Sequence, residues 1–329
     1  MNRQMVLVIA LLACAAAQAA TGVGTAQLNY PVLRAAVPVT VDGDVQGDPA
    51  WQGAPQVTGF SVLGNGYTKA KQTTARMLWD EKGLYVAVVC EEPDAASLKP
   101  SVRDYGDTWV EDSLEIFLQP AQQVYQIGVT AGGAKGSGEG GPEVGRMTAA
   151  SKIGADFYSI ECLIPAEVLK ASLRGGDKWR AGICRNIFTT PSGGDKFTSW
   201  TPLQSRFLEP ENFAILTFSS EAGNAAKASE LTEQLNAPYR ETLLKEVQVA
   251  AAQGEQYQAA LKEASDDATF GERARKLLRD WRQIEKLSQA RDSASTLDMR
   301  RSLTQLQALN EQSYQIKYKY LINKLLSEN

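Results

Sequence analysis

The stretch RDYGDTWVEDSLEIFLQPAQQVYQIGVT, residues 103–130, contains the alternation that decides the fold. Within it Leu114, Ile116 and Leu118 take every second position, and Tyr125 to Val129 repeats the pattern. A period of two places apolar side chains on one face of a β-strand. Similar short runs between turn residues recur up to about residue 219, so we expect an antiparallel β-sandwich there.

The sequence changes character near Ser219, because Gly and Pro become rare beyond Phe218. The pattern is now helical, with apolar residues at spacings of three and four. We expect residues 220–329 to form an α-helical bundle or hairpin, with a dimerisation or docking arm as the alternative. The apolar residues that define the expected faces are Leu277, Trp281, Ile284, Leu287, Leu303, Leu306, Leu309, Tyr320 and Leu325.

The first nineteen residues have the pattern of a secretory signal. Arg3 precedes an apolar run from Met5 to Ala17, and residues 17–19 form an A-x-A cleavage site. We expect cleavage after Ala19, which leaves a β-region at 20–219 and a helical region at 220–329. The alternative uses residues 11–14 as a lipobox, with a lipid on Cys14. Either way the protein is expected to be exported, to the periplasm, the cell surface or the extracellular medium.

Composition excludes several classes of site. The chain of 329 residues contains no histidine, which removes Ser-His-Asp catalysis and His-ligated zinc or haem. Its formal net charge of −4 argues against nucleic acid as a partner, since phosphate binding needs an excess of Lys and Arg.

Three cysteines remain after the expected cleavage: Cys90, Cys162 and Cys184. An odd number allows at most one internal disulfide, and the sequence does not decide the pairing. All three lie in strand-like runs, which favours small buried apolar side chains.

Two motifs resemble ligand sites without the required context. GSGEGG, residues 136–141, matches a dinucleotide fingerprint but is followed by Pro142 where a helix should begin, so we interpret it as a hairpin loop. DGDVQGD, residues 42–48, starts like a calcium loop but has Gly53 at its twelfth position, so we interpret it as a turn.

The cluster around Trp109 is the serious candidate for a site. An aromatic face suits the C–H groups of a sugar, and carboxylates accept hydrogen bonds from its hydroxyls. Trp109 and Glu115 supply both, and Trp200 lies in a second polar, loop-like stretch. A glycosidase using Asp112 and Glu115 is the catalytic alternative. We expect the other tryptophans of the β-region to be core residues: Trp51, Trp79 and Trp179.

Seven stretches occur in the order and spacing of family 9 carbohydrate-binding modules, and the sequence between about residues 35 and 219 resembles that family. The stretches are VDGDVQGDPAW, LWDEKGLYVAVVCEEPD, RDYGDTWVEDSLEIFLQP, YQIGVTAGG, IECLIPAEVL, WRAGICRNIF and SWTPLQSRFLEPENFAILTF. The resemblance implies a jelly-roll-like sandwich that binds sugars without cutting them. It also implies structural calcium ions.

Carried over by position, the resemblance assigns Trp109 and Trp200 as the two tryptophans that sandwich a sugar. Glu115 is similar to the carboxylate that bonds the hydroxyls, and Gln126 adds a polar contact. The family's arginines match Arg103 and Arg185, either of which could equally pair with Asp112 or Glu115. The identity of any metal site is left open.

We therefore expect an exported, non-catalytic protein that binds a polysaccharide or oligosaccharide. No cofactor is required, and calcium would be structural. The alternative is a cell-envelope assembly or scaffold protein whose helical region mediates self-association or binding to an envelope protein.

Overall fold

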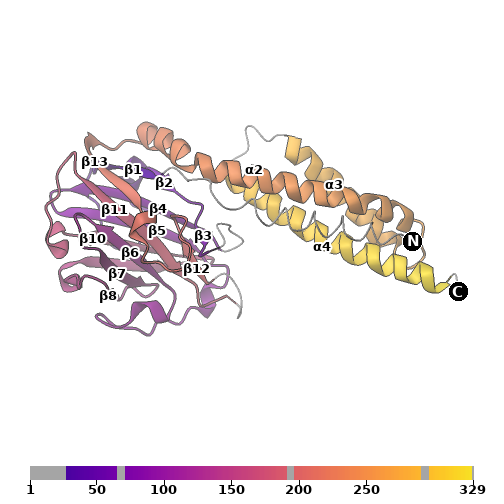
Figure 1. Cartoon of the computed structure of the whole chain (residues 1–329), viewed down its shortest axis with the longest axis horizontal. Helices are drawn as coiled ribbons and strands as arrows, with labels where there is room; N and C mark the ends of the chain where they lie inside the picture. The colour runs from indigo at the N-terminus through magenta and orange to yellow at the C-terminus, as the bar shows by residue number, and fades with distance from the viewer. Residues whose placement is uncertain (1–26, 65–70, 191–195, 290–295, 328–329) are drawn as a thin grey trace, which may run out of the picture. The chain divides into compact units, whose positions relative to one another are not determined.

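The computed structural model describes residues 27–64, 71–190, 196–289 and 296–327 (Figure 1). These residues form two compact units that divide between Ala228 and Ser229, and Val57–Gly59 group with the second unit. We call the first the sandwich unit and the second the helical unit. The expected signal segment, residues 1–19, lies outside the described residues.

The sandwich unit is built on one mixed β-sheet, with a main path in the order β8-β7-β6-β11-β13-β1-β4-β5-β10-β9. This confirms a mostly β region followed by helices. The strands are β1 (Asn29–Arg34), β2 (Gln56–Val57), β3 (Ser61–Val62), β4 (Thr73–Asp80), β5 (Gly83–Glu91), β6 (Ser113–Gln119), β7 (Tyr125–Thr130), β8 (Lys135–Ser137), β9 (Thr148–Ile153), β10 (Phe157–Ile164), β11 (Lys178–Asn186), β12 (Phe197–Ser199) and β13 (Ala214–Ala222).

Along this path every pair is antiparallel except those of β1, which runs parallel to both β13 and β4. The prediction of a purely antiparallel sheet is therefore wrong at β1. The physical reason is that β1 joins strands far away in sequence, and local alternation carries no information about such pairing.

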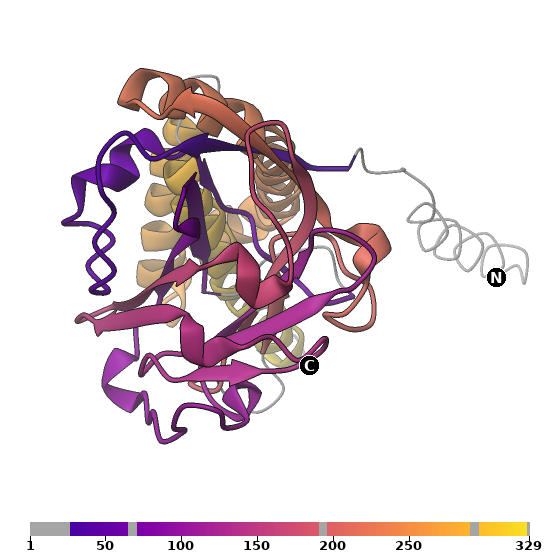
Figure 2. The ribbon, with the colours of Figure 1, turned by 90° about the vertical axis from the view of Figure 1, so that its left-hand side faces the viewer.

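The strands form a curved sheet (Figure 2), and the side chains buried within the unit are mostly apolar. Leu114, Ile116 and Leu118 of β6 are at most 1% exposed, as their alternation predicted. The Phe218 ring of β13 lies 4.9 Å from Trp179 of β11 and 6.1 Å from Trp79 of β4, both nearly edge-on. These aromatic contacts join strands from both halves of the main path, and the core expectation for the two tryptophans is confirmed.

The turn at residues 42–48 is held by a buried carboxylate. Glu161 of β10 accepts hydrogen bonds from the backbone N–H groups of Asp42 (3.1 Å) and Gly43 (2.7 Å), and from Nε1 of Trp51 (2.6 Å). Gly43 has φ +90°, and an added Cβ would lie 2.5 Å from the Ser151 backbone. The sequence motif thus serves the fold: its carboxylate partner fixes the turn against β9 and β10.

The three cysteines of the sandwich unit are free thiols with at most 1% exposure. Burial raises the pKa of the Cys162 thiol to about 12, so it stays protonated at neutral pH. The interpretation of Cys90, Cys162 and Cys184 as small buried apolar residues is confirmed.

The helical unit consists of α2 (Ala225–Ala264), α3 (Gly271–Gln289) and α4 (Thr296–Ser327). Trp281 of α3 sits where the three helices meet: its Nε1 donates to Ser313 Oγ of α4 at 3.1 Å, and Gly254 of α2 leaves room for its ring. An added Cβ at Gly254 would fall 1.8 Å from that ring. The shared core is buried Leu243, Val247, Ala250, Leu261, Ala264, Ala274, Leu277, Trp281, Ile284, Met299, Leu303, Leu306, Leu309 and Ile316.

The predicted helical faces are confirmed for the residues that are at most 7% exposed, namely Leu277, Trp281, Ile284, Leu303, Leu306 and Leu309, while the side chain of Leu287 lies outside the described part of the chain. Tyr320 is partly buried against the shared core. Leu325 is 62% exposed, so its prediction as a core residue is wrong; the last turns of α4 expose apolar side chains. None of the described helices has the combination of length and hydropathy needed to cross a membrane.

Candidate functional site

Glu115 of β6 is the centre of a polar cluster on the sheet face opposite to Leu114. Its Oε1 accepts a hydrogen bond from Asn186 Nδ2 at 2.8 Å, and its Oε2 accepts one from Gln126 Nε2 at 2.5 Å. We call these three residues the Glu115 cluster. Neighbouring strands supply them, since β6 pairs with β7 on one side and β11 on the other.

The carboxyl group of Glu115 is almost completely shielded from solvent. Glu115 is only 5% exposed, and burial raises the pKa of its carboxyl against the lowering effect of the two amide donors. Because each amide uses an N–H on the carboxylate, the group is fixed in one orientation. A carboxylate in this state suits the binding of hydroxyl donors.

Trp109 lies in a short 3-10 helix, Thr108–Val110, that contacts β6 and β7. The helix can approach because β7 and β8 have glycines beneath it: an added Cβ at Gly128 would lie 1.7 Å from Thr108 Oγ1, and one at Gly136 would lie 2.8 Å from Thr108 Cγ2. Thr108 is fully buried, while the Trp109 side chain is partly exposed. The structure thus places Trp109 on the two strands that supply Glu115 and Gln126.

The loop before Trp109 is tied to β8. The backbone N–H of Tyr105 donates to the carbonyl of Lys135 at 2.7 Å, and Asp104 Oδ1 accepts from the Lys135 N–H at 3.0 Å. Arg103 is exposed in this loop. Among the described residues no hydrogen bond joins Arg103 to the Glu115 cluster, so its role in sugar binding stays a prediction.

The structure places Trp200 in the core. Its side chain is 5% exposed, and its ring packs edge-on against Tyr30 with centroids 5.9 Å apart. A sugar needs an open ring face, so this burial contradicts the prediction that Trp200 stacks on a ligand. The polar turn residues around it suggested exposure, but Tyr30, distant in sequence, decides the burial.

Arg185 also lies inside the sandwich. Its Nη2 donates to Glu92 Oε2 at 3.2 Å and to the Glu91 carbonyl at 2.9 Å, and the guanidinium stands 5.2 Å from the Tyr158 ring centre. Neither side chain of the Arg185–Glu92 pair is exposed. The prediction of Arg185 as a sugar ligand is wrong, and its ion-pair partner is Glu92, not Asp112 or Glu115.

Asn186 and Phe188 are the residues that sequence reasoning missed. Asn186 is the next residue after Arg185, so alternation along β11 turns it to the face of Glu115. Phe188 follows two positions later with 41% exposure, and its backbone N–H donates to Asp112 Oδ1 at 3.0 Å. The signal that could have found both is the alternation along this segment, which places Asn186 and Phe188 on the face opposite to the buried Ile183.

The two carboxyls of the catalytic alternative have separate surroundings. Asp112 accepts from the backbone of Phe188 and lies near Arg185 and Glu92, whereas Glu115 bonds to Asn186 and Gln126 on the other face. Burial raises the pKa of Asp112 too. No hydrogen-bond partner is common to the two carboxyls in the described part of the chain, which does not favour a paired acid and base.

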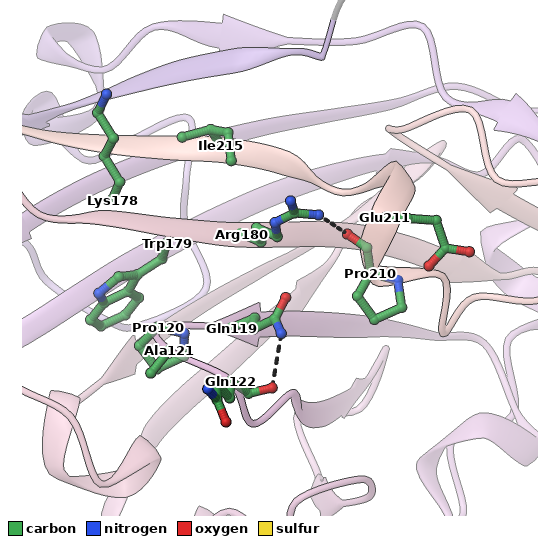
Figure 3. A pocket seen from close by; sticks show the side chains of 10 residues that line it. All are labelled: Gln119, Pro120, Ala121, Gln122, Lys178, Trp179, Arg180, Pro210, Glu211 and Ile215. Atoms are coloured by element: carbon green, nitrogen blue, oxygen red, sulfur yellow. Dashed lines mark hydrogen bonds between the residues drawn. The ribbon is translucent and has the colours of Figure 1, made fainter.

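A depression of about 530 Å³ lies on the same sheet face. Gln119, Arg180 and Ile215 are cross-strand neighbours in its wall, and Arg180 Nη1 donates to the Pro210 carbonyl at 2.9 Å (Figure 3). Gln119 is four residues from Glu115, roughly 13 Å along β6. Phe117 lies between them and packs against Phe213, with ring centroids 5.6 Å apart, so the two surfaces are separate.

Neither ligand-like motif forms the site that its pattern suggests. Lys135–Ser137 is β8, and the GSGEGG segment leads through a turn to a three-residue 3-10 helix, Val144–Arg146. This agrees with its interpretation as a loop. Within the described residues no group of three or more Cys, Asp and Glu side chains could hold a metal ion, so the structure offers no such ligand set for the predicted calcium.

Comparison with solved structures gives matches that cover 59–60% of the chain. A putative carbohydrate-binding protein from Bacteroides uniformis is 16% identical, with TM-score 0.48 over 59% of this chain and 100% of that one. A family 9 carbohydrate-binding module from Caldicellulosiruptor kristjanssonii is 17% identical. Its glucose complex gives TM-score 0.46 over 60% of this chain and 98% of that one, and its cellotriose complex gives 0.43 over 59% and 95%.

Among curated proteins, endo-1,4-beta-xylanase A from Thermotoga neapolitana is 29% identical over 96 residues. The aligned part is 29% of this chain and 8% of the xylanase, so the chain matches a small part of that enzyme.

The family comparison covers most of the sandwich unit. The model of the carbohydrate family 9 binding domain-like family matches residues 41–213, within the range that the sequence motifs predicted. The matched residues make up more than half of the 329, and they include β6, β7 and β11, which supply the Glu115 cluster. The protein belongs to the carbohydrate family 9 binding domain-like family.

Proposed function

We propose that the sandwich unit binds a carbohydrate on the sheet face that contains Trp109 and the Glu115 cluster. The observation that carries the proposal is the carboxylate of Glu115, buried and oriented by two amides, on a strand contacted by the short helix that contains the partly exposed Trp109. The tryptophan would contact the C–H face of a sugar ring, and Glu115 would accept from its hydroxyls. Membership of the carbohydrate family 9 binding domain-like family supports this ligand class.

Phe188 takes the place that we first gave to Trp200. Its exposed ring follows Asn186 on the strand that supplies the cluster, and the Lys196 Nζ lies 5.7 Å from the ring centre. We therefore propose Trp109 and Phe188 as the aromatic contacts, with Glu115, Gln126 and Asn186 as the polar ones. Arg103 remains a candidate at the edge of this surface.

The proposal is for binding without catalysis, by a protein exported through its first nineteen residues to the periplasm, the cell surface or the medium. The separate surroundings of Asp112 and Glu115 support a non-catalytic role. Structural calcium belongs to the proposal as a prediction without assigned ligands. If the protein is instead a cell-envelope scaffold, it should bind no sugar, and its helical unit should mediate self-association or binding to an envelope protein.

The test is a glycan array on the chain without residues 1–19, beside the variants Trp109→Ala, Phe188→Ala and Glu115→Gln, with and without calcium. Arg180→Ala, in the depression of Figure 3, is the control. We expect binding by the parent and the control and its loss from the other three. A folded parent that binds no glycan would contradict the proposal. Loss of binding in Arg180→Ala alone would indicate that the sugar binds in the depression of Figure 3.

A further inference from the structure

The last turns of α4 expose a row of apolar and aromatic side chains. Tyr314, Tyr318, Ile322 and Leu326 are 43%, 44%, 57% and 74% exposed. Their spacing of four residues places them one above another on a single helix face. Scattered exposed apolar residues are ordinary, but a continuous row marks an interaction surface. We call these four residues the α4 row.

The α4 row is not a continuation of the core of the helical unit. Ser313 and Ile316, on the same helix, are 0% and 6% exposed, and Ile316 belongs to the shared core. At 3.6 residues per turn, the α4 row is centred on the opposite side of the helix from these two residues. The helix therefore buries one face in the bundle and presents a second apolar face to its surroundings.

The α4 row lies in a basic segment. Residues 312–327 contain Lys317, Lys319 and Lys324 and no Asp or Glu, although the whole chain has a net charge of −4. The Lys317 Nζ stands 5.5 Å from the ring centre of Tyr257 and 5.6 Å from that of Tyr318, and the other two lysines are exposed. Such a surface fits an anionic partner.

We propose that this segment of α4 docks on an anionic phospholipid surface. Ile322 and Leu326 would enter the boundary between headgroups and acyl chains, and the tyrosines would lie at headgroup depth, where amphipathic rings are favoured. Lys319, which flanks the row, would reach the headgroup phosphates, and Lys324, in the last turn of the helix, would add positive charge near the surface. A second copy of the chain fits less well, because apposed segments would bring the three lysines of each copy together with one nearby carboxylate, Glu311.

The test is co-sedimentation of the chain without residues 1–19 with lipid vesicles; the removal matters because the apolar run near the start would itself insert. We expect binding to mixed phosphatidylglycerol and phosphatidylcholine vesicles and about tenfold weaker binding to phosphatidylcholine alone. Added salt should weaken binding to the mixed vesicles until it approaches the binding to phosphatidylcholine alone.

Two double variants separate the apolar and the charged contributions. Ile322→Ser with Leu326→Ser, and Lys319→Gln with Lys324→Gln, should each weaken binding to the anionic vesicles by about tenfold. Val249→Ser is the matched control, since Val249 is 58% exposed on α2 and should leave binding unchanged. All these side chains are exposed, so circular dichroism should report an intact fold.

Equal sedimentation of the parent and both double variants would overturn the proposal, as would equal binding to vesicles with and without phosphatidylglycerol. A parent that is dimeric in gel filtration, and becomes monomeric in the Ile322 and Leu326 double variant without any vesicle binding, would also overturn it and assign the row to contact between copies. Glycan binding should be the same in every variant.

Discussion

Asn186 Nδ2 donates a hydrogen bond to Glu115 Oε1 across 2.8 Å, and this contact joins β11 to β6 on the outer face of the sheet. The residue just before Asn186 donates to Glu92 inside the sandwich. One strand thus serves the core and the candidate site with adjacent side chains. The predictions below separate these two roles.

The substitution Glu115→Gln should weaken sugar binding by about tenfold or more, because a hydrogen bond to a charged acceptor contributes about 1.5–3 kcal/mol. The Gln side chain has nearly the same shape, but its NH2 group turns a donor toward one of the two amide donors, so thermal unfolding is measured beside affinity to separate a loss of binding from a loss of stability. Titration calorimetry with the best ligand from the array would measure the loss. Glu211→Gln, beside the depression in Figure 3, is the matched control and should bind like the parent. Unchanged affinity in Glu115→Gln would contradict a direct role for the carboxylate.

The substitution Trp200→Phe should lower stability and leave sugar binding intact, since Trp200 packs on Tyr30 in the core. Trp109→Phe should do the reverse, because its ring is partly exposed on the candidate site. Thermal melts and affinity measured on both variants give a crossed comparison. A Trp200→Phe variant that keeps its melting temperature but no longer binds the sugar would support the original prediction that Trp109 and Trp200 both contact the ligand.

The substitution Glu161→Ala should destabilise the sandwich unit by about 3 kcal/mol or more. It removes the acceptor for two backbone N–H groups and the Trp51 indole, and a buried donor without a partner costs about 1–3 kcal/mol. Chemical denaturation followed by tryptophan fluorescence would measure it. Glu143→Ala, whose side chain is 62% exposed, should stay within about 0.5 kcal/mol of the parent.

The substitution Gly254→Ala should destabilise the helical unit, by about 1–3 kcal/mol, because the added methyl would overlap the Trp281 ring. Helix propensity alone predicts the opposite sign, a gain of roughly 0.5–1 kcal/mol. The sign of the change in the free energy of unfolding therefore decides between the two effects. The exposed neighbour Ala252→Ser is the control on the same helix.

Glu209 should make a contribution to the free energy of unfolding that is lost as the pH falls. Burial works to raise the pKa of its carboxyl, but hydrogen bonds from Gln204, Ser205 and Asn212 outweigh burial and lower the pKa to about 2. A carboxyl with a lowered folded-state pKa stabilises the fold above its unfolded value, near 4.5, and loses this contribution as pH falls toward 2. The stability difference between the parent and Glu209→Gln should shrink across that interval in denaturation at a series of pH values. A constant difference would contradict the assignment.

The sequence predicted those features that depend on local pattern. The alternation at Leu114, Ile116 and Leu118 identified a buried strand face, and the spacing of Leu277, Trp281 and Ile284 identified a helix face. Local pattern did not distinguish Trp109 from Trp200, because both lie among polar turn residues and the second is buried by packing that includes Tyr30, a residue far away in sequence.

Local alternation also predicted part of the candidate site. Glu115 and Gln126 follow from alternation on adjacent strands, and the structure joins them by a hydrogen bond. The family resemblance assigned Arg185 by position, but β11 directs Arg185 into the interior and the neighbouring Asn186 toward Glu115. The parallel pairing of β1 could not be predicted, since it depends on segments almost two hundred residues apart, such as Asn29 and Ile215.

That pairing has a consequence for the time at which the sheet is completed during synthesis. β13, Ala214–Ala222, lies between β11 and β1, so a ribosome that has made only the first two hundred residues has produced a sheet with its central strand missing. Until then the two halves present unpaired edges that can join to other chains. The backbone hydrogen bonds within each helix are local, so the formation of a helix does not depend on a distant strand. For the sandwich unit, the last strand to be made is the one that closes the sheet.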